Sequence, residues 1–171
     1  MSHHPPRILA ISGSLRAGSS NTILLRAAAS VTPPGVEISL SDAPGGLPFF
    51  NPDLDGDTVP VAVAEFRAEV GESAGVLISS PEYAHGVPGV LKNALDWLVG
   101  SVQCEIVNKP VVLLNASPRA TYAQAQLAET LRVMGARVVT TVTLAGQIIG
   151  GVVDDAARAS LREAIEALLS A

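Results

Sequence analysis

The chain has 171 residues, enough for one compact domain with a full hydrophobic core, and 48% of them are hydrophobic against 16% charged. This composition excludes an intrinsically disordered protein. The formal net charge of −5 argues against nucleic acid or an anionic membrane surface as the main partner, and no apolar run is long enough to span a bilayer.

Cysteine content and the first residues indicate the cellular compartment. The one cysteine, Cys104, excludes an internal disulfide and a zinc site built from cysteines. Residues 1–6 include two histidines and two prolines, and they lack the apolar segment of a secretory signal. We therefore expect a cytoplasmic protein with one domain over residues 1–171. We expect residues 1–5 to form a flexible terminus, and we interpret His3 and His4 as part of it rather than as metal ligands.

Apolar, β-branched segments alternate with helical patterns along the whole chain. In chain order, the pattern predicts a strand at 7–11, a helix at 21–30, a strand at 36–40, a long irregular loop at 41–58, a helix at 59–72, a strand at 75–79, a helix at 88–98, a strand at 110–115, a helix at 123–134, a strand at 137–144 and a helix at 155–170. The first strand is continuously apolar, which indicates burial on both faces, whereas the alternation at 36–40 predicts a less buried strand.

Five strands, each followed by a helix, predict an α/β fold with a parallel sheet covered by helices on both faces, a three-layer sandwich. In open sheets of this kind, ligands bind beyond the carboxyl ends of the strands, where the strand order reverses. In a flavodoxin-like order, 2-1-3-4-5, this point lies between the first and third strands. We therefore expect the segments that follow these two strands to form a site together.

The segment after the first strand has the residues of a phosphate site. Gly13 and Gly18 permit tight turns and a close approach of the backbone. Arg16 adds a guanidinium that suits phosphate, beside the open N–H groups of a helix start. Hydroxyl and amide groups come from Ser14, Ser19, Ser20 and Asn21. The glycine spacing matches neither the dinucleotide fingerprint nor the Walker loop, and an ordinary capped turn with a solvated arginine stays open as the alternative.

The segment after the third strand predicts a platform for a flat ring. Pro81 stiffens the turn, and Tyr83 can lie against a heteroaromatic ring. Glu82 is either a general base or a carboxylate bonded to the backbone. His85 is either a general acid or a surface histidine, and we favour the surface interpretation. A phosphorylated planar cofactor would bridge the two segments, and flavin mononucleotide (FMN) fits that description.

A helix with one tryptophan follows this second segment. Leu91, Leu95 and Leu98 form one apolar stripe of the predicted helix at 88–98. Trp97 is open to two interpretations, packing in the core or contact between subunits.

Three motifs stand out together in the chain. They are Gly13-Ser14-x-Arg16-x-x-Ser19-x-Asn21, Pro81-Glu82-Tyr83, and Pro88-Gly89-x-Leu91-Lys92-Asn93-Ala94-x-Asp96-Trp97. With these motifs the chain resembles the NADPH-dependent FMN reductase family, which includes bacterial quinone, chromate and azo-dye reductases of flavodoxin-like fold. The resemblance covers about residues 6–145.

The resemblance implies a flavoprotein reductase with FMN as cofactor. Hydride would pass from NADPH or NADH to FMN and then, in a ping-pong cycle, to a quinone, free flavin or similar small-molecule acceptor. The phosphate would be held by Ser14, Arg16, Ser19 and Asn21. The ring would be lined by Pro81, Glu82 and Tyr83, with Ser117 on its other side. We include Ser20 and Ala84 in the predicted cofactor site, and no side chain is required as an acid or base.

The chain departs from the family pattern in two places. Many relatives carry asparagine where this chain has Ala84. The loop at 116–122 lacks the glycines that often follow the fourth strand, so Pro118 and Arg119 would alter how nicotinamide stacks or which acceptor enters. Arg119 is either a contact for a nucleotide phosphate or a surface arginine.

Two other functions stay open on the sequence alone. A flavodoxin-like electron carrier would bind FMN without oxidising NAD(P)H directly, and a phosphate-binding module would have no redox activity. The family commonly forms homodimers or homotetramers, and in this chain the helix at 88–98 is the candidate surface. We predict no metal, nucleic acid or membrane partner.

Overall fold

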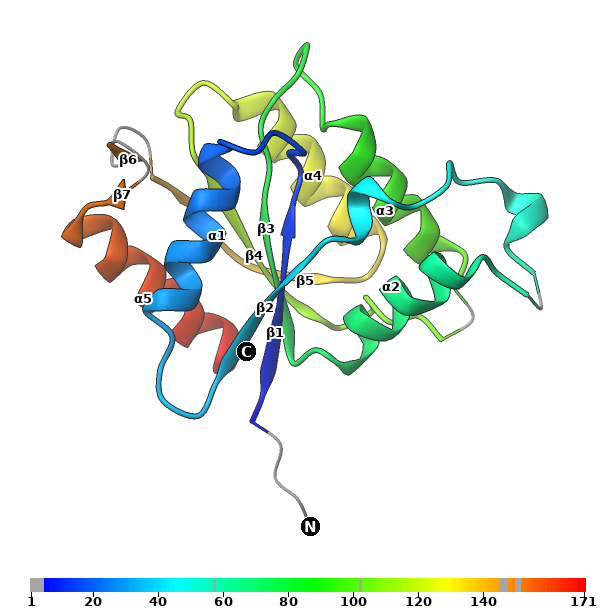
Figure 1. Cartoon of the computed structure of the whole chain (residues 1–171), viewed down its shortest axis with the longest axis horizontal. Coiled ribbons are helices and arrows are strands. Elements are labelled where there is room, and N and C mark those ends of the chain that lie inside the picture. The colour runs from blue at the N-terminus through cyan, green and yellow to red at the C-terminus, as the bar shows by residue number, and fades with distance from the viewer. Residues whose placement is uncertain (1–4, 57, 102, 145–147, 150–151) are drawn as a thin grey trace.

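Five parallel strands form the centre of the computed structural model, which describes residues 5–56, 58–101, 103–144, 148–149 and 152–171. In chain order they are β1 Arg7–Ser12, β2 Glu37–Ser41, β3 Gly75–Ser79, β4 Pro110–Asn115 and β5 Arg137–Thr143. The order in the sheet is β2-β1-β3-β4-β5, and every neighbouring pair is parallel (Figure 1). The predicted flavodoxin-like topology is confirmed.

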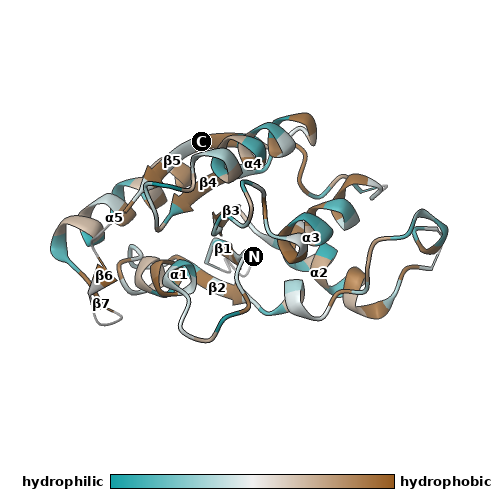
Figure 2. Cartoon of the chain, turned by 90° about the horizontal axis from the view of Figure 1, so that it is seen from above, coloured by the Kyte–Doolittle hydropathy of each residue, from teal (hydrophilic) through white to brown (hydrophobic). Residues whose placement is uncertain are grey.

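Five helices cover the two faces of this sheet. They are α1 Ser20–Ser30, α2 Val61–Glu72, α3 Gly89–Val99, α4 Thr121–Val133 and α5 Asp155–Leu169. Helices α1 and α5 pack on one face, and α2, α3 and α4 pack on the other (Figure 2). The three predicted layers are therefore present.

Side chains of the central strands alternate between the two cores. Ile8 and Ala10 of β1 pack in the core with α1 and α5, whereas Leu9 and Ile11 pack in the core with α2, α3 and α4. A strand that is buried on both faces has no polar positions, so its sequence is a continuous apolar run. At the edge of the sheet, β2 is exposed or half-buried except at its last residue, as the alternating pattern predicts.

Two short 3-10 turns and a small hairpin complete the described elements. The turns are Ala43–Gly45 and Pro52–Leu54, and the hairpin joins β6 Ile148–Ile149 to β7 Val152–Val153. The sequence pattern does not predict the hairpin, because its strands are only two residues long. Asp154 then begins α5, where its carboxylate accepts a hydrogen bond from the Ala157 N–H at 2.7 Å.

The tryptophan of α3 packs inside the domain, where it orders the long loop at 42–60. Trp97 is fully buried, its ring lies edge-on to Phe50 at 5.0 Å between centroids, and its indole N–H donates to the Pro48 carbonyl. Asn93 donates to the same carbonyl and accepts from the Phe50 N–H at 2.8 Å. The interpretation of Trp97 as a core residue is therefore correct. Its burial excludes a contact between subunits through this side chain.

A buried ion pair holds the same loop against α2 and α3. Arg67 donates to Asp55 at 2.8 Å and to the Trp97 carbonyl at 2.8 Å. The two charged side chains are 12% and 8% exposed. Asp55 lies so close to Gly100 that any Cβ there would overlap its carboxylate. The described part of this loop is thus fixed by specific contacts although most of it is irregular.

No helix in the described ranges has the length and apolarity that a membrane span needs. His3 and His4 lie outside the described residues, so their interpretation as part of a flexible terminus stays a prediction.

Candidate functional site

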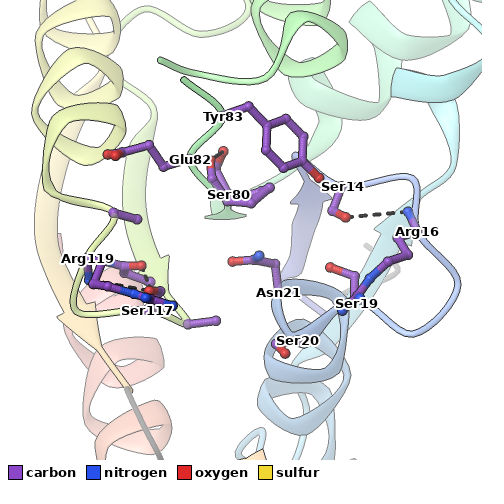
Figure 3. A pocket seen from close by; sticks show the side chains of 14 residues that line it. Ser14, Arg16, Ser19, Ser20, Asn21, Ser80, Glu82, Tyr83, Ser117 and Arg119 are labelled. Atoms are coloured by element: carbon purple, nitrogen blue, oxygen red, sulfur yellow. Dashed lines mark hydrogen bonds between the residues drawn. The ribbon is translucent and has the colours of Figure 1, made fainter. Parts of the chain in front are cut away.

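A cleft of about 500 Å³ opens beyond the carboxyl ends of β1, β3 and β4 (Figure 3). This volume is typical of a cofactor or small-molecule site. Its lining consists of Ser14, Arg16, Ser19, Ser20, Asn21, Ser80, Pro81, Glu82, Tyr83, Asn115, Ala116, Ser117, Arg119 and Ala120. The cleft lies at the position where the strand order reverses, as the topology predicts.

The structure brings together all but one of the residues predicted for the cofactor site. The exception is Ala84, which is exposed and lies outside the lining of the cleft. Ser80 and Asn115 were not predicted, although both lie at the carboxyl end of a strand. That position is a signal that sequence reasoning can use, because the cleft forms where parallel strands end.

The loop before α1 offers open hydrogen-bond donors to the cleft. Ser19 is the N-cap of α1, but its hydroxyl makes no capping hydrogen bond. The first N–H groups of the helix lack intrahelical acceptors, as at every helix start. Arg16 bends back over the loop and donates to the Gly18 carbonyl at 2.9 Å. Hydroxyl, amide and guanidinium donors at a positive helix end suit an anion such as a phosphate.

A buried polar seam joins this loop to the end of β3. The Gly13 N–H donates to the Ser79 carbonyl at 2.8 Å, and the Ser79 hydroxyl donates to the Asn21 side-chain oxygen at 3.0 Å. This bond fixes the side chain of Asn21, which points toward the cleft in Figure 3 and offers its amide group there. The seam fixes the distance between the two predicted halves of the site.

The loop after β3 forms the opposite wall and is bonded to α4. The Glu82 carboxylate accepts from the Ala123 N–H at 2.8 Å, so it caps the first turn of α4. Of the two interpretations of Glu82, the structure therefore supports the carboxylate bonded to backbone. Tyr83 is 59% exposed and its ring projects over the cleft (Figure 3). His85 is exposed and stacks on Tyr122 with 4.3 Å between ring centroids.

The loop after β4 closes the third side of the cleft. The buried side chain of Asn115 accepts from the Ser117 N–H at 3.0 Å, and the Ser117 hydroxyl accepts from the Arg119 N–H at 3.3 Å. These two bonds hold the turn in a fixed shape without glycine. Arg119 lies at the rim near Ser117, so a second guanidinium faces the same cleft.

The charges of the lining favour an anionic ligand. Two arginines, Arg16 and Arg119, face the cleft, and the single carboxylate, Glu82, is engaged by a helix N-terminus. In the part of the chain that the structure describes, no three histidine, cysteine, aspartate or glutamate side chains group to hold a metal ion. The site has the donor set of a phosphate pocket joined to a wall that bears an aromatic ring.

Comparison with known proteins decides the family. The family model of NADPH-dependent FMN reductases matches residues 6–149. The chain belongs to this family. An NAD(P)H-dependent FMN reductase of Pseudomonas aeruginosa is 33% identical over 172 residues, which cover 95% of this chain and 92% of that protein. As a member of the family, the chain is an oxidoreductase with FMN as cofactor and NAD(P)H as co-substrate.

Two further proteins that are similar to this chain extend the comparison. A 2-hydroxy-1,4-benzoquinone reductase of Burkholderia is 44% identical over 91 residues, which cover 53% of this chain and 49% of that enzyme. FerB of Paracoccus denitrificans, a flavoenzyme NAD(P)H:(acceptor) oxidoreductase, matches in structure with a TM-score of 0.78, 28% identity and 96% coverage of both chains. The shared fold includes the strand ends that form the cleft.

The residues of the cleft fit FMN. A phosphomonoester needs several donors without a competing carboxylate, and the loop before α1 provides them from Ser14 to Asn21. The hydroxyl of Ser19 is available because it makes no capping bond. A flat ring needs a wall with fixed backbone groups, which the loop at Pro81 supplies because Glu82 is bonded to α4.

Proposed function

We propose that this protein transfers reducing equivalents from NAD(P)H to a quinone or a similar small-molecule acceptor through FMN held in the cleft. The observation that carries the proposal is the pairing of a donor-rich helix N-terminus with an aromatic wall across one cleft of about 500 Å³. When bound, FMN supplies a ring that accepts hydride from the nicotinamide and passes electrons on. The protein supplies position and electrostatics.

Each loop has a separate proposed role. Ser14, Arg16, Ser19, Ser20 and Asn21 would bind the phosphate with neutral and charged donors. This assignment is supported by the open N–H groups of α1 and by the position of Arg16 at the rim of the same loop.

The loops after β3 and β4 would lie on either side of the ring. Pro81, Glu82 and Tyr83 would form one side and Ser117 another, with backbone groups facing the ring edge. Ala84 would act only through the shape of its loop, because it does not line the cleft. Glu82 would hold the loop through its bond to a helix N–H, and we assign no general base among the described residues of the lining.

The acceptor and the nucleotide would use the same opening. The cleft has one aromatic rim residue, Tyr83, and one arginine, Arg119, beyond the proposed phosphate loop. The benzoquinone reductase among the relatives supports a quinone as acceptor. A single site visited in turn by donor and acceptor is the basis of a ping-pong cycle, which we propose for this enzyme.

We also propose that the protein forms a homodimer or homotetramer through the face between α3 and α4. Val99 and Val133 are 64% and 70% exposed there, on either side of a groove of about 320 Å³. Large exposed apolar side chains in neighbouring positions are typical of an interface. Sedimentation velocity would test it: a monomer at micromolar concentration would contradict this part of the proposal.

We further propose a cytoplasmic location, which the supply of NAD(P)H there supports.

One spectroscopic experiment tests the central proposal. Protein incubated with FMN and desalted would retain the visible flavin spectrum, and anaerobic titration with NADPH or NADH would bleach it. The faster nucleotide would identify the donor. Retained flavin that stays oxidised would instead indicate an electron carrier. Absence of both retained flavin and turnover of free FMN would leave only a binding module without redox activity.

A further inference from the structure

The loop after β3 contains two consecutive residues in a backbone conformation that is unfavourable for them. Ala84 and His85 have φ angles of 49° and 60°. Tyr83 and Gly86 on either side exchange two backbone hydrogen bonds of 3.1 and 2.9 Å. Residues 83–86 therefore form a tight hairpin whose turn consists of Ala84 and His85. Glycine and asparagine dominate at such positions because a Cβ is strained at positive φ. This chain has neither there.

Contacts from α4 hold the strained hairpin in place. Glu82, just before the hairpin, accepts from an N–H group of the first turn of α4. Val87, just after it, donates its N–H to the Gln126 side-chain oxygen at 2.8 Å. Between these two bonds, the imidazole of His85 lies on the ring of Tyr122 with 17° between the planes. In these three contacts the hairpin contributes one side chain, that of His85. The partners, Tyr122, Ala123 and Gln126, all belong to α4.

The same loop is one wall of the cleft. Pro81, Glu82 and Tyr83 line it directly, and they come immediately before the strained pair. The partner ring, Tyr122, follows the loop at 115–120, which is the wall that closes the third side of the cleft. The stacked rings therefore connect the two walls, outside the cleft and on the side of α4. A change in the stack would alter the position of one wall relative to the other.

We propose that His85 and Tyr122 are a positioning pair that holds the Pro81–Tyr83 wall of the cleft through the strained hairpin. The inference rests on the proposed function for its kinetic consequence, whereas its structural consequence concerns the chain alone. Neither ring lines the cleft, so their role is to place other residues. His85 is a surface histidine, the interpretation that its sequence context favours, and its contact with Tyr122 adds a specific role for that exposed side chain.

Amide hydrogen exchange tests the structural part without reference to catalysis. In the 171-residue chain, with and without FMN, Tyr122→Ala should increase exchange at the Gly86 and Val87 amides about fivefold, the effect of losing one aromatic stack. Tyr122→Phe keeps the ring and should exchange like the wild type. Exchange in Tyr122→Ala that is indistinguishable from wild type would overturn the proposal.

Kinetics test the positioning part. Tyr122→Ala should slow reduction of bound flavin by NAD(P)H about tenfold, because a displaced wall misaligns the reacting groups, while KM for the nucleotide changes less than about twofold. Tyr122→Phe should restore the rate. A variant with a lower melting temperature but an unchanged reduction rate would show a merely structural role and overturn the proposal. Failure of wild-type flavin to bleach would instead reject the proposed function.

A double-mutant cycle links the stack to the strain. Ala84→Gly removes the Cβ that makes the left-handed conformation unfavourable. In that background, Tyr122→Ala should increase amide exchange about twofold rather than fivefold, because the hairpin then needs less support. Equal effects in both backgrounds would show that the stack does not oppose backbone strain, and would overturn this explanation of its role.

Discussion

Adding one methyl group at Gly13 should disturb the site more than adding one at Gly18 or Gly86, the other glycines of its loops. Gly13 follows β1 directly and its N–H is bonded to the end of β3. A Cβ placed there would lie 2.6 Å from the Ser80 hydroxyl oxygen, 3.0 Å from the Ser80 Cβ and 3.2 Å from a methyl group of Leu91. Gly13 does not have a left-handed φ, so crowding alone decides the effect.

The expected magnitude follows from burial of the neighbours. Ser80 and Leu91 are 1% and 0% exposed, so neither has free space into which it can move. Overpacking of this kind costs about 1–3 kcal/mol. For a domain of this size, each kcal/mol lowers the melting temperature by about 2–4 °C, which gives a total decrease of about 2–12 °C. Because Ser80 lines the cleft, we also expect FMN affinity to fall about tenfold.

Thermal unfolding of Gly13→Ala beside Gly18→Ala is the assay. Gly18 belongs to the same loop, but no atom lies within 4 Å of a Cβ added to it. We expect that control to change the free energy of unfolding by less than about 0.5 kcal/mol. Ser80→Ala combined with Gly13→Ala should recover part of the loss, because it removes the nearest atom and leaves the Cβ contact. Equal melting temperatures for the two glycine variants would refute the close packing of the strand ends.

Three further substitutions test the phosphate position, the ion pair of the long loop and the titration of one lysine. Arg16→Ala should weaken FMN binding about 10- to 100-fold at low salt, and less at high salt, as measured by fluorescence titration; unchanged affinity would count against the phosphate position. Arg67→Met should lower the free energy of unfolding in urea by about 3–5 kcal/mol, because Asp55 stays buried without its partner; a loss below about 1 kcal/mol would contradict this. Burial lowers the pKa of Lys109, although Glu105 opposes the shift. The folded protein therefore binds this proton less tightly than the unfolded chain, and stability should rise with pH from the folded pKa up to the ordinary value of 10.5. Lys109→Met should lack that increase, and equal pH slopes for both proteins would exclude the effect.

The sheet and its covering helices were predictable because the pattern that specifies them is local. Strands at 75–79 and 110–115 have the predicted bounds, since each is a continuous apolar run between turn residues. Their alternation with helices predicted a parallel sheet, and the resemblance to the family implied the flavodoxin-like strand order. The site between β1 and β3 followed from that order. The donors of the loop at 13–21 were visible as residue types at a helix start.

Helix boundaries were less predictable where a distant residue acts as the cap. The pattern predicts a helix from Ala123, but α4 begins at Thr121. Glu82, from a loop 41 residues earlier, accepts the Ala123 N–H. A helix cap leaves a recognisable sequence pattern only when it lies within the few residues before the helix, so a capping residue from another part of the chain leaves none.

The sequence by itself determined the strands, the helices and the chemical character of the loops, because local propensity and periodicity depend only on neighbouring residues. Tertiary structure alone decided which interpretation of each ambiguous residue holds. Trp97 became a core residue because the loop at 42–60 folds over it. Glu82 became a helix cap, and His85 became the partner of Tyr122, because the fold brings the loop after β3 against α4. Contacts between segments far apart in the chain leave no local pattern, so only the folded structure shows them.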